Sequence, residues 1–239
     1  MAFELGGNAP FVVFEDADLH EAIEGAAAIK FMRVAGQSCI CANRIYVQES
    51  IAARFIPAFI ERVRAITVGD GFQAGVEVGP LINEATLHKV ERLVQDAVAQ
   101  GAQVAVGGQR LRTGALSQGW FYAPTVLLDV RDEMPVCQEE IFGPVAPVLT
   151  FRTEAELIAR ANATTFGLAS YVYTQDYARI IRLAEALEYG LVGVNDATGY
   201  THEMPFGGFK ESGLGREGGH EGLEEYLESK SIVLHMPQS

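Results

Sequence analysis

Alternating apolar and polar blocks in the second half of the chain predict parallel strands joined by helices. Val145–Phe151 is a largely apolar run, and an amphipathic helical pattern follows it over about Glu154–Asn162. The order then repeats, with a strand over 169–174, a helix over 177–187 and a strand over 191–195. Strands separated by single helices are typical of parallel βαβ units. The pattern therefore predicts an α/β fold with an open, mostly parallel sheet flanked by helices.

The first half of the chain contains strand and helix patterns of the same kinds. Phe11–Phe14 is a continuous apolar run, which indicates a buried strand. Asp18 and Glu21 resemble a capping box at the start of a helix that continues to about Phe31. A loop over 36–42 follows, and the remaining elements are expected as strands over 44–48 and 104–106 and helices over 51–64 and 84–100.

Two further strands are predicted at the margins of the fold. Tyr122–Leu128 contains Pro124, and proline is tolerated in edge strands, so this segment is expected as an edge or hairpin strand. A helix near 221–226 precedes Ser231–His235, an apolar run that predicts a strand with no later segment to pair with. Such a strand favours pairing across a subunit boundary, which predicts a homo-oligomer.

Composition narrows the class of protein. The chain has 239 residues, of which 49% are hydrophobic, so it can bury a sizeable core in one large domain or two small ones. Its net charge of −13 argues against a nucleic-acid surface. No stretch approaches the ~20 apolar residues of a membrane span, and the N-terminus lacks a secretory pattern. Three cysteines suit neither a disulfide scaffold nor a four-ligand zinc site, so no metal is expected and a reducing cytoplasm fits best.

The strongest chemical candidate is Cys39, which follows the turn Gly36-Gln37-Ser38. Backbone N–H groups of such a turn can depress the pKa of the thiol and stabilise an oxyanion formed on attack. The alternative is an inert, buried cysteine, which is the commoner fate of a lone thiol. Cys41 faces away from Cys39 in an extended chain and is expected to be structural, although a bend would let the two form a disulfide.

Carboxylates beside glycines give three more candidate segments. Glu4 precedes Gly6-Gly7, which permits a close approach, and it is either a base or a solvated bystander. Glu140 lies before Phe142 and a Gly-Pro turn, and it is either a hydroxyl-binding carboxylate or part of a solvated loop. Phe206 lies in an aromatic-flanked turn that serves packing or binding. Gly213–Gly218 is rejected as a dinucleotide fingerprint, because its glycines do not give the required spacing after a strand.

Taken together, these motifs resemble the aldehyde dehydrogenase superfamily, and specifically its C-terminal catalytic part. They occur in the family's order and span nearly the whole chain. The matching motifs are Glu-Leu-Gly-Gly-Asn from Glu4, Gly-Gln-Ser-Cys from Gly36, Glu-Glu-Ile-Phe-Gly-Pro-Val from Glu139, and Pro-Phe-Gly-Gly-Phe-Lys-Glu-Ser-Gly-Leu-Gly-Arg-Glu from Pro205.

The resemblance implies a role for each motif. Cys39 is implied to attack an aldehyde and form a thiohemiacetal, which becomes a thioester after hydride transfer to a nicotinamide. Glu4 is implied to be the base that activates water for thioester hydrolysis, and the Cys39 N–H is implied to contribute to the oxyanion hole. Glu140 is implied to bind the nicotinamide ribose, with Phe142 packed nearby. The cofactor is NAD or NADP, and the motifs do not choose between them.

Within the superfamily, Cys-Ile-Cys-Ala-Asn-Arg from Cys39 and Ser-Gly-Leu-Gly-Arg-Glu-Gly from Ser212 are most similar to succinate-semialdehyde dehydrogenases. Arg33 falls where those enzymes hold the substrate carboxylate, which implies a small anionic aldehyde as substrate. Two departures occur: the segment before Cys39 is one residue longer than expected, around Met32, and Tyr200-Thr201 replaces a small hydroxyl residue. Either Thr201 or the Tyr200 hydroxyl substitutes for it, or the substrate is a different aldehyde, and Phe206 is expected to contact substrate.

The resemblance also implies a division of the chain. Residues 1–217 are expected to form the thiol-bearing catalytic domain, and residues 218–239 a C-terminal helix and oligomerisation strand. The family's N-terminal NAD-binding domain has no counterpart in these motifs, so the chain alone is expected to bind the cofactor weakly or not at all. The rival interpretation is a non-catalytic truncated fragment that folds and oligomerises, with at most residual esterase activity.

Overall fold

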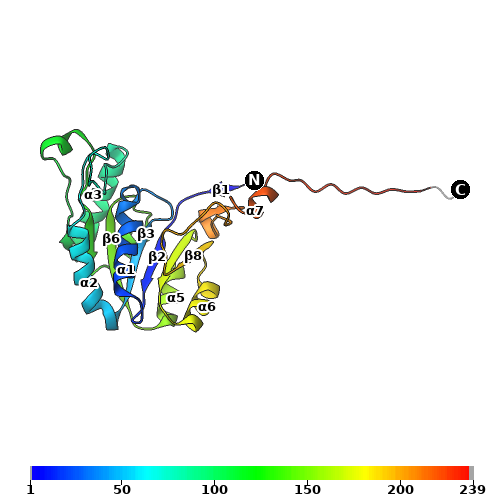
Figure 1. Ribbon diagram of the computed structural model, residues 1–239, viewed down its shortest axis with the longest axis horizontal. Helices are drawn as coiled ribbons and strands as arrows, with labels where there is room; N and C mark the ends of the chain where they lie inside the picture. The colour runs from blue at the N-terminus through cyan, green and yellow to red at the C-terminus, as the bar shows by residue number, and fades with distance from the viewer. Residues whose placement is uncertain (1, 237–239) are drawn as a thin grey trace.

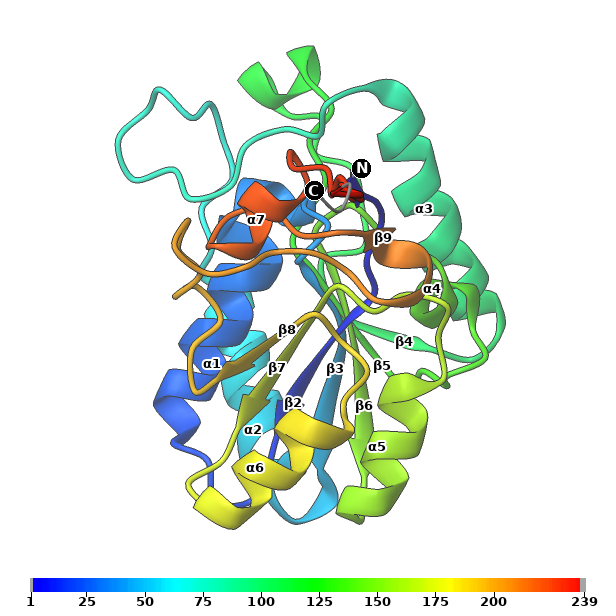
Figure 2. The ribbon, with the colours of Figure 1, turned by 90° about the vertical axis from the view of Figure 1, so that its right-hand side faces the viewer.

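Seven strands form one twisted sheet in the computed structural model, which describes residues 2–236 (Figures 1 and 2). The strand order is β4-β5-β6-β3-β2-β7-β8, and every neighbouring pair is parallel except β4 with β5. The predicted open, mostly parallel sheet is therefore confirmed. The strands are β2 (Ala9–Val13), β3 (Ala42–Gln48), β4 (Gln103–Val106), β5 (Thr125–Leu128), β6 (Val145–Phe151), β7 (Ala169–Tyr173) and β8 (Leu191–Val194).

Helices cover both faces of this sheet, as the two views show (Figures 1 and 2). Because side chains alternate along a strand, Phe11 and Val13 pack on one face and Val12 and Phe14 on the other. The first face is covered by α1 (Leu19–Ala27) and α2 (Glu49–Arg64). The second is covered by α3 (Glu84–Ala99), α4 (Pro135–Gln138), α5 (Glu154–Asn162) and α6 (Tyr177–Ala186).

The first helix begins as predicted and ends in an unusual way. The Asp18 carboxylate caps α1 by accepting hydrogen bonds from the N–H groups of His20 and Glu21, at 2.9 and 3.1 Å. After α1 the chain continues as a π-helix over Ala28–Met32, and the Arg33 N–H donates to the Ala28 carbonyl at 2.9 Å. The wider turn of a π-helix takes up more residues per turn than an α-helix, and such turns occur frequently at functional sites.

Of the two alternatives predicted for residues 122–128, the edge strand is wrong, whereas the hairpin is supported, because β4 and β5 follow one another in the chain and pair antiparallel. β5 lies inside the sheet between β4 and β6, and β4 is the edge. Pro124 stands one residue before β5, so its missing N–H removes no hydrogen bond from the strand ladder.

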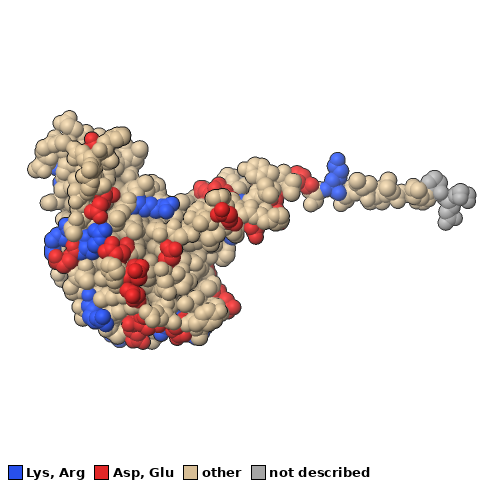
Figure 3. Space-filling view, viewed as in Figure 1, with Lys and Arg blue, Asp and Glu red and all other residues tan. Residues whose placement is uncertain are grey.

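The C-terminal segment differs from the prediction in a second way. α7 covers only Glu221–Glu224, and residues 231–236 run away from the body of the protein without forming a strand (Figure 1). These residues carry no Lys, Arg, Asp or Glu, and their side chains are exposed (Figure 3). A strand is defined by a hydrogen-bonded neighbour, which this single chain does not supply here. Pairing across a subunit boundary therefore stays a prediction.

A small two-stranded sheet connects the two ends of the chain. β1 (Phe3–Glu4) pairs antiparallel with β9 (Gly213–Leu214). Gly213 has a φ of +145°, and a Cβ there would lie 2.0 Å from the Phe3 carbonyl oxygen, so only glycine permits this pairing. The pairing fixes Glu4 just ahead of β2.

Among residues 2–236, no helix is long and apolar enough to cross a membrane.

Candidate active site

The candidate catalytic segments meet at the amino ends of three adjacent strands. β3 lies between β2 and β6, and all three run parallel. Glu4 precedes β2, Cys39 precedes β3, and Glu140 precedes β6. Residues from three distant parts of the sequence are thus brought to one edge of the sheet.

Two glycines bring these segments into direct backbone contact. A Cβ at Gly7 would lie 2.0 Å from the Cys39 carbonyl oxygen. Gly36 has a φ of +74°, and a Cβ there would lie 2.4 Å from the Gly143 carbonyl oxygen. The Gly7 N–H also donates to Glu140 Oε1 at 3.0 Å. The glycines of the three motifs are therefore required by close packing of one motif on another.

The loop that carries Cys39 is held by several hydrogen bonds. Val34 and Ala35 both have left-handed backbones, with φ of 47° and 55°, which is strained for residues with a Cβ. The Gln37 side chain donates to the Val34 carbonyl at 3.0 Å and accepts from the Ile82 N–H at 2.8 Å. The Tyr171 hydroxyl donates to the Ile40 carbonyl at 2.7 Å. These bonds give the loop a defined shape at the cost of local strain.

The Cys39 thiol is half-buried and is influenced by two nearby carboxylates. Burial raises its pKa, and the carboxylates of Glu140 and Glu4 raise it further. Hydrogen bonding from the N–H groups of Cys39 and Ile40 lowers the pKa but does not compensate. The suggestion that the turn depresses this pKa is therefore not supported, because burial and two carboxylates outweigh the backbone donors. All three cysteines are free thiols, so no Cys39–Cys41 disulfide is present.

Glu4 has the properties of a general base that is not yet engaged. Its Oε2 atom is buried and has no hydrogen-bond partner among residues 2–236. Burial raises the pKa of Glu4, as does the negative charge of Glu217, while Arg216 opposes the shift. A carboxylate with a raised pKa and a free oxygen atom is suited to accept a proton from water.

The geometry around Glu140 fits a ligand hydroxyl. Oε1 is engaged by the Gly7 N–H, whereas a Cβ at Gly6 would lie 3.3 Å from Oε2. A side chain at Gly6 would therefore crowd this second oxygen, and the Phe166 ring, 3.0 Å from the same Cβ position, forms the other side of the approach. Phe142, two residues on, is half-buried and has a left-handed backbone with φ of 55°, a strained conformation of the kind found at ligand sites. The residues present thus fit a ribose-bearing cofactor.

A cavity of about 180 Å³ borders the loop that carries Cys39, residues 33–40, which is called the nucleophile loop after the proposed role of Cys39. Arg33 and Tyr200 line it, together with Ile40, the residue after Cys39. Thr201 is exposed and does not line this cavity, and its hydroxyl hydrogen-bonds Glu203 instead. Phe206 supports the wall from behind, with its ring centroid 4.9 Å from that of Tyr200. The other lining residues are Tyr171, Leu191, Val192, Gly193, Val194, Asp196, Ala197, Gly199 and Met204.

Three buried polar residues near the site were not singled out from the sequence. Asn8 and Asn43 are almost wholly buried, and Lys30 is fully buried with an Nζ atom that has no hydrogen-bond partner among the described residues. Burial lowers the pKa of Lys30, and the nearby Cys41 thiol acts against this shift. The available signal was a polar residue next to a predicted strand, as with Asn43 directly before the strand predicted over 44–48.

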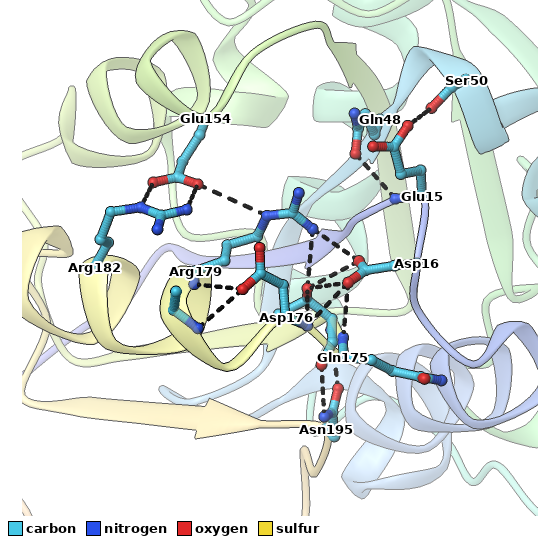
Figure 4. A network of polar contacts seen from close by, with 12 residues as sticks. Glu15, Asp16, Gln48, Ser50, Glu154, Gln175, Asp176, Arg179, Arg182 and Asn195 are labelled. Carbon is cyan, nitrogen blue, oxygen red and sulfur yellow. Dashed lines mark hydrogen bonds and ion pairs between the residues drawn. The ribbon is translucent and has the colours of Figure 1, made fainter.

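The carboxyl end of the same sheet is built differently (Figure 4). Asp16, which follows β2, accepts hydrogen bonds from the Thr174 hydroxyl at 2.8 Å, the Asp176 N–H at 2.9 Å and Arg179 Nη1 at 2.8 Å. Glu154 joins this cluster through Arg179, whose Nε lies 3.7 Å from Glu154 Oε2, and it also accepts from Arg182 Nε at 2.7 Å. The Asp16 carboxylate is satisfied by protein groups here, so its side chain ties several segments together, although Arg179 Nε is buried without a hydrogen-bond partner among the described residues.

Comparisons with known proteins find matches over nearly the whole chain. A sequence model described as "Aldehyde dehydrogenase family" matches residues 1–232. The mitochondrial succinate-semialdehyde dehydrogenase of Arabidopsis thaliana is 53% identical over 234 residues, covering 98% of this chain and 43% of the relative. The 3-sulfolactaldehyde dehydrogenase of Pseudomonas putida is 51% identical over 234 residues, covering 98% of this chain and 47% of the relative.

Solved structures agree with these sequence matches. The crystal structure of succinate-semialdehyde dehydrogenase from Burkholderia pseudomallei superposes with a TM-score of 0.89 at 49% identity, covering 93% of this chain and 45% of that one. The chain spans about half the length of the curated relatives it matches.

Proposed function

Because the chain belongs to the aldehyde dehydrogenase family, we propose that it carries the thiol-bearing part of an NAD(P)-dependent enzyme that oxidises a small anionic aldehyde to a carboxylate. Its relatives are named for succinate semialdehyde and 3-sulfolactaldehyde, two aldehydes that bear an acidic group. Arg33 in the wall of the cavity supplies a guanidinium for such a group. Residues 1–217 are proposed as the catalytic domain.

One observation carries the proposal: the segments that hold Glu4, Cys39 and Glu140 meet at the amino ends of β2, β3 and β6, where Gly7 packs on the Cys39 carbonyl and donates to Glu140. In the proposed mechanism, Cys39 Sγ attacks the aldehyde carbon and forms a thiohemiacetal, and the Cys39 N–H stabilises the oxyanion. When bound, a nicotinamide ring would supply the hydride acceptor, and Glu140 Oε2 and Phe142 would hold its ribose. Glu4 then deprotonates a water molecule that hydrolyses the Cys39 thioester.

Acylation by an activated ester tests the nucleophile without a cofactor. On mixing the chain with p-nitrophenyl acetate, we expect a burst of roughly one nitrophenolate per chain, with the acetyl group found on Cys39 by peptide mass spectrometry. Cys39→Ala should abolish the burst. Cys41→Ala is the matched control, since Cys41 is buried two residues away, and it should retain the burst. A burst that survives in Cys39→Ala would rule the proposal out.

A second candidate function is a non-catalytic fragment that folds and associates. The raised pKa of Cys39 favours it, because a protonated thiol is a weak nucleophile at neutral pH. Iodoacetamide distinguishes the two candidates when labelling is followed residue by residue. Alkylation of Cys39 well ahead of the buried Cys41 and Cys137 supports the catalytic part, and equal, slow labelling of all three supports the fragment.

Cofactor binding is expected to be weak in the 239 residues taken alone. The chain spans about half the length of its relatives, so a dinucleotide meets only part of the surface that they offer. We therefore expect no NADH or NADPH formation from succinate semialdehyde by this chain by itself. Measurable formation, followed at 340 nm, would contradict this expectation.

Assembly is proposed to involve the exposed C-terminal segment. Ile232, Val233 and Leu234 are among the most exposed apolar residues of the chain, and a strand edge on a second copy would cover them. Sedimentation velocity of the intact chain and of a chain ending at Lys230 tests this. We expect a homo-oligomer that the truncation converts to a monomer, and an unchanged oligomer in the shortened chain would exclude this role.

A further inference from the structure

A pair of buried asparagine side chains lies directly behind the candidate site. Asn8 follows Gly7 and is 1% exposed, while Asn43 is the second residue of β3 and is 2% exposed. Asn43 Nδ2 donates to Asn8 Oδ1 at 2.8 Å. The pair therefore joins the segment that carries Glu4 to the strand that follows Cys39.

The same two amides also hold the backbone on both sides of Glu140. Asn43 Nδ2 donates to the Glu139 carbonyl at 2.9 Å, and Asn43 Oδ1 accepts from the Ile141 N–H at 3.2 Å. Asn8 Nδ2 donates to the Cys137 carbonyl at 2.9 Å. Asn43 is thus hydrogen-bonded to the backbone of the residue before Glu140 and of the residue after it.

The two amides satisfy backbone groups of Cys137, Glu139 and Ile141, and they do so at a particular place in the fold. Burying an amide is favourable only when its hydrogen bonds are made, and apolar side chains of the same size fill a core at lower cost. What the amides add is direction, because each bond fixes one backbone atom relative to another. The atoms fixed here belong to the segments of the base, the nucleophile and the cofactor-binding carboxylate.

We propose that Asn43 is a positioning residue that sets the separation of the Glu140 carboxylate and the Cys39 thiol. β3 connects Asn43 to the nucleophile loop, and its two backbone bonds connect it to Glu140. The nucleophile and the cofactor-binding group are therefore placed as one unit. This inference rests on the proposed function for the roles of Cys39 and Glu140, and the bonds of Asn43 are independent of it.

The electrostatic effect of Glu140 on Cys39 provides a measurable signal. A nearby carboxylate raises the pKa of a thiol, so removing its charge or moving it away produces more thiolate at a given pH. Glu4 also acts on Cys39 and is left unchanged in every variant. Alkylation by iodoacetamide reports the thiolate fraction and requires neither aldehyde nor cofactor.

The experiment is a double-mutant cycle on the alkylation rate of Cys39 between pH 7 and 10. Glu140→Gln should raise the rate at pH 8 by about threefold or more, which corresponds to about half a pKa unit. Asn43→Ser should raise it in the same direction, because Glu140 is released from its fixed place. In the double variant the rate should not exceed that of Glu140→Gln, since the charge that Asn43 positions is already gone.

Asn195 supplies a matched control for loss of a bridging amide. Its side chain donates to the Thr174 carbonyl at 2.8 Å and accepts from the Thr174 N–H at 3.0 Å, at the opposite end of the sheet. Asn195→Ser should lower the melting temperature and leave Cys39 alkylation unchanged. If Asn43→Ser does not fold, Asn8→Ser takes its place in the cycle, with the same non-additivity expected.

Two results would overturn the inference. One is an unchanged alkylation profile in a folded Asn43 or Asn8 variant. The other is a double variant whose alkylation rate rises by the product of the two single-variant factors. The asparagine would then act on Cys39 through something other than Glu140. Failure of the proposed function is seen separately, as a missing nitrophenolate burst in a chain whose cycle still shows the coupling.

Discussion

The two ends of the parallel sheet are built from opposite kinds of interaction. At the amino end, Glu4 Oε2 is buried without a partner among the described residues, and Val34 and Ala35 have strained, left-handed backbones. At the carboxyl end, Asp16 accepts hydrogen bonds from Thr174 and Arg179 among others. The carboxylate at the amino end thus keeps a free oxygen atom, whereas the carboxylate at the carboxyl end is engaged on both oxygens, although its partner Arg179 has a buried Nε without a hydrogen bond among the described residues.

This difference also appears in the direction of the pKa shifts. Burial and the negative charge of Glu217 raise the pKa of Glu4, and the positive charge of Arg216 opposes them more weakly. Burial also acts on Asp16, but hydrogen bonds from Thr174 and Gln175 and the charge of Arg179 outweigh it and lower the pKa. At the amino end the surroundings destabilise the ionised form of Glu4. At the carboxyl end they stabilise the ionised form of Asp16.

The contrast teaches where a free carboxylate is kept in this fold. Open α/β sheets commonly bind ligands beyond the carboxyl ends of their strands. Here side chains close part of that end (Figure 4), and the glycine-packed motifs and the free carboxylate oxygen of Glu4 lie at the amino end. Left-handed residues with a Cβ occur at both ends, with Val34 and Ala35 before β3 and Asn195 after β8, so the free carboxylate and not the strain distinguishes the amino end.

The largest expected effect comes from Glu4 at the amino end. Glu4→Gln should slow hydrolysis of the Cys39 acetyl thioester by about 100-fold or more, since a positioned general base contributes about that much. Acylation by p-nitrophenyl acetate should continue, so the acetylated chain should accumulate and be visible by intact mass. In the unmodified chain, the hydrolysis rate should rise with pH with a midpoint above 4.5, the ordinary value for this group. A fast, unchanged hydrolysis in Glu4→Gln would remove the base from the mechanism.

The next effect is on stability, at the carboxyl end. Asp16→Asn keeps the shape but loses acceptors for Thr174, Asp176 and Arg179, so unfolding in urea should become easier by about 1–3 kcal/mol. The nitrophenolate burst of the folded variant should stay within about twofold of the original. Loss of the burst without unfolding would mean that the two ends are not separate in function.

Acid should weaken the carboxyl-end cluster in a defined range. The folded-state pKa of Asp16 lies below its ordinary value of 3.8, so the stabilisation is fully present above about pH 4 and is lost as the pH falls through the lower, folded value. Urea midpoints between pH 3 and 6 should decrease toward acid in the unmodified chain. In Asp16→Asn this decrease should be smaller, and an identical decrease in both chains would contradict the assignment.

The smallest expected effect concerns backbone strain in the nucleophile loop. Val34 is 59% exposed and has a φ of 47°, so Val34→Gly should relieve strain and raise stability by about 0.5–1 kcal/mol. Ile181→Gly is the matched control, because Ile181 is an exposed apolar residue inside α6, where glycine should cost about 1 kcal/mol. Equal destabilisation by both substitutions would show that the loop stores no strain.

Much of the fold followed from the sequence because the hydrophobic periods are regular. The strand and helix alternation over 145–195 correctly predicted β6, β7 and β8 with α5 and α6 between them. Asp18 correctly marked the start of α1. The interior position of β5 was missed because Pro124 stands just outside the strand, and its effect depends on a register that the sequence does not show.

The candidate site was predicted in its parts but not in its arrangement. Motifs pointed to Cys39, Glu4 and Glu140, yet only the order of β2, β3 and β6 shows that they share one edge of the sheet. The direction of the Cys39 pKa shift was missed, because it depends on burial and on carboxylates distant in sequence. Asn43 was passed over because its partners lie 35 to 98 positions away.

The most direct test of the account compares one variant from each end of the sheet in the same ester assay. Cys39→Ala and Asp16→Asn are prepared in folded form, and the nitrophenolate burst is measured beside the urea midpoint of each. We predict that Cys39→Ala loses the burst and keeps its midpoint, whereas Asp16→Asn keeps the burst and unfolds at lower urea. A burst that persists in Cys39→Ala would contradict the central claim that the amino end of the sheet carries the nucleophile.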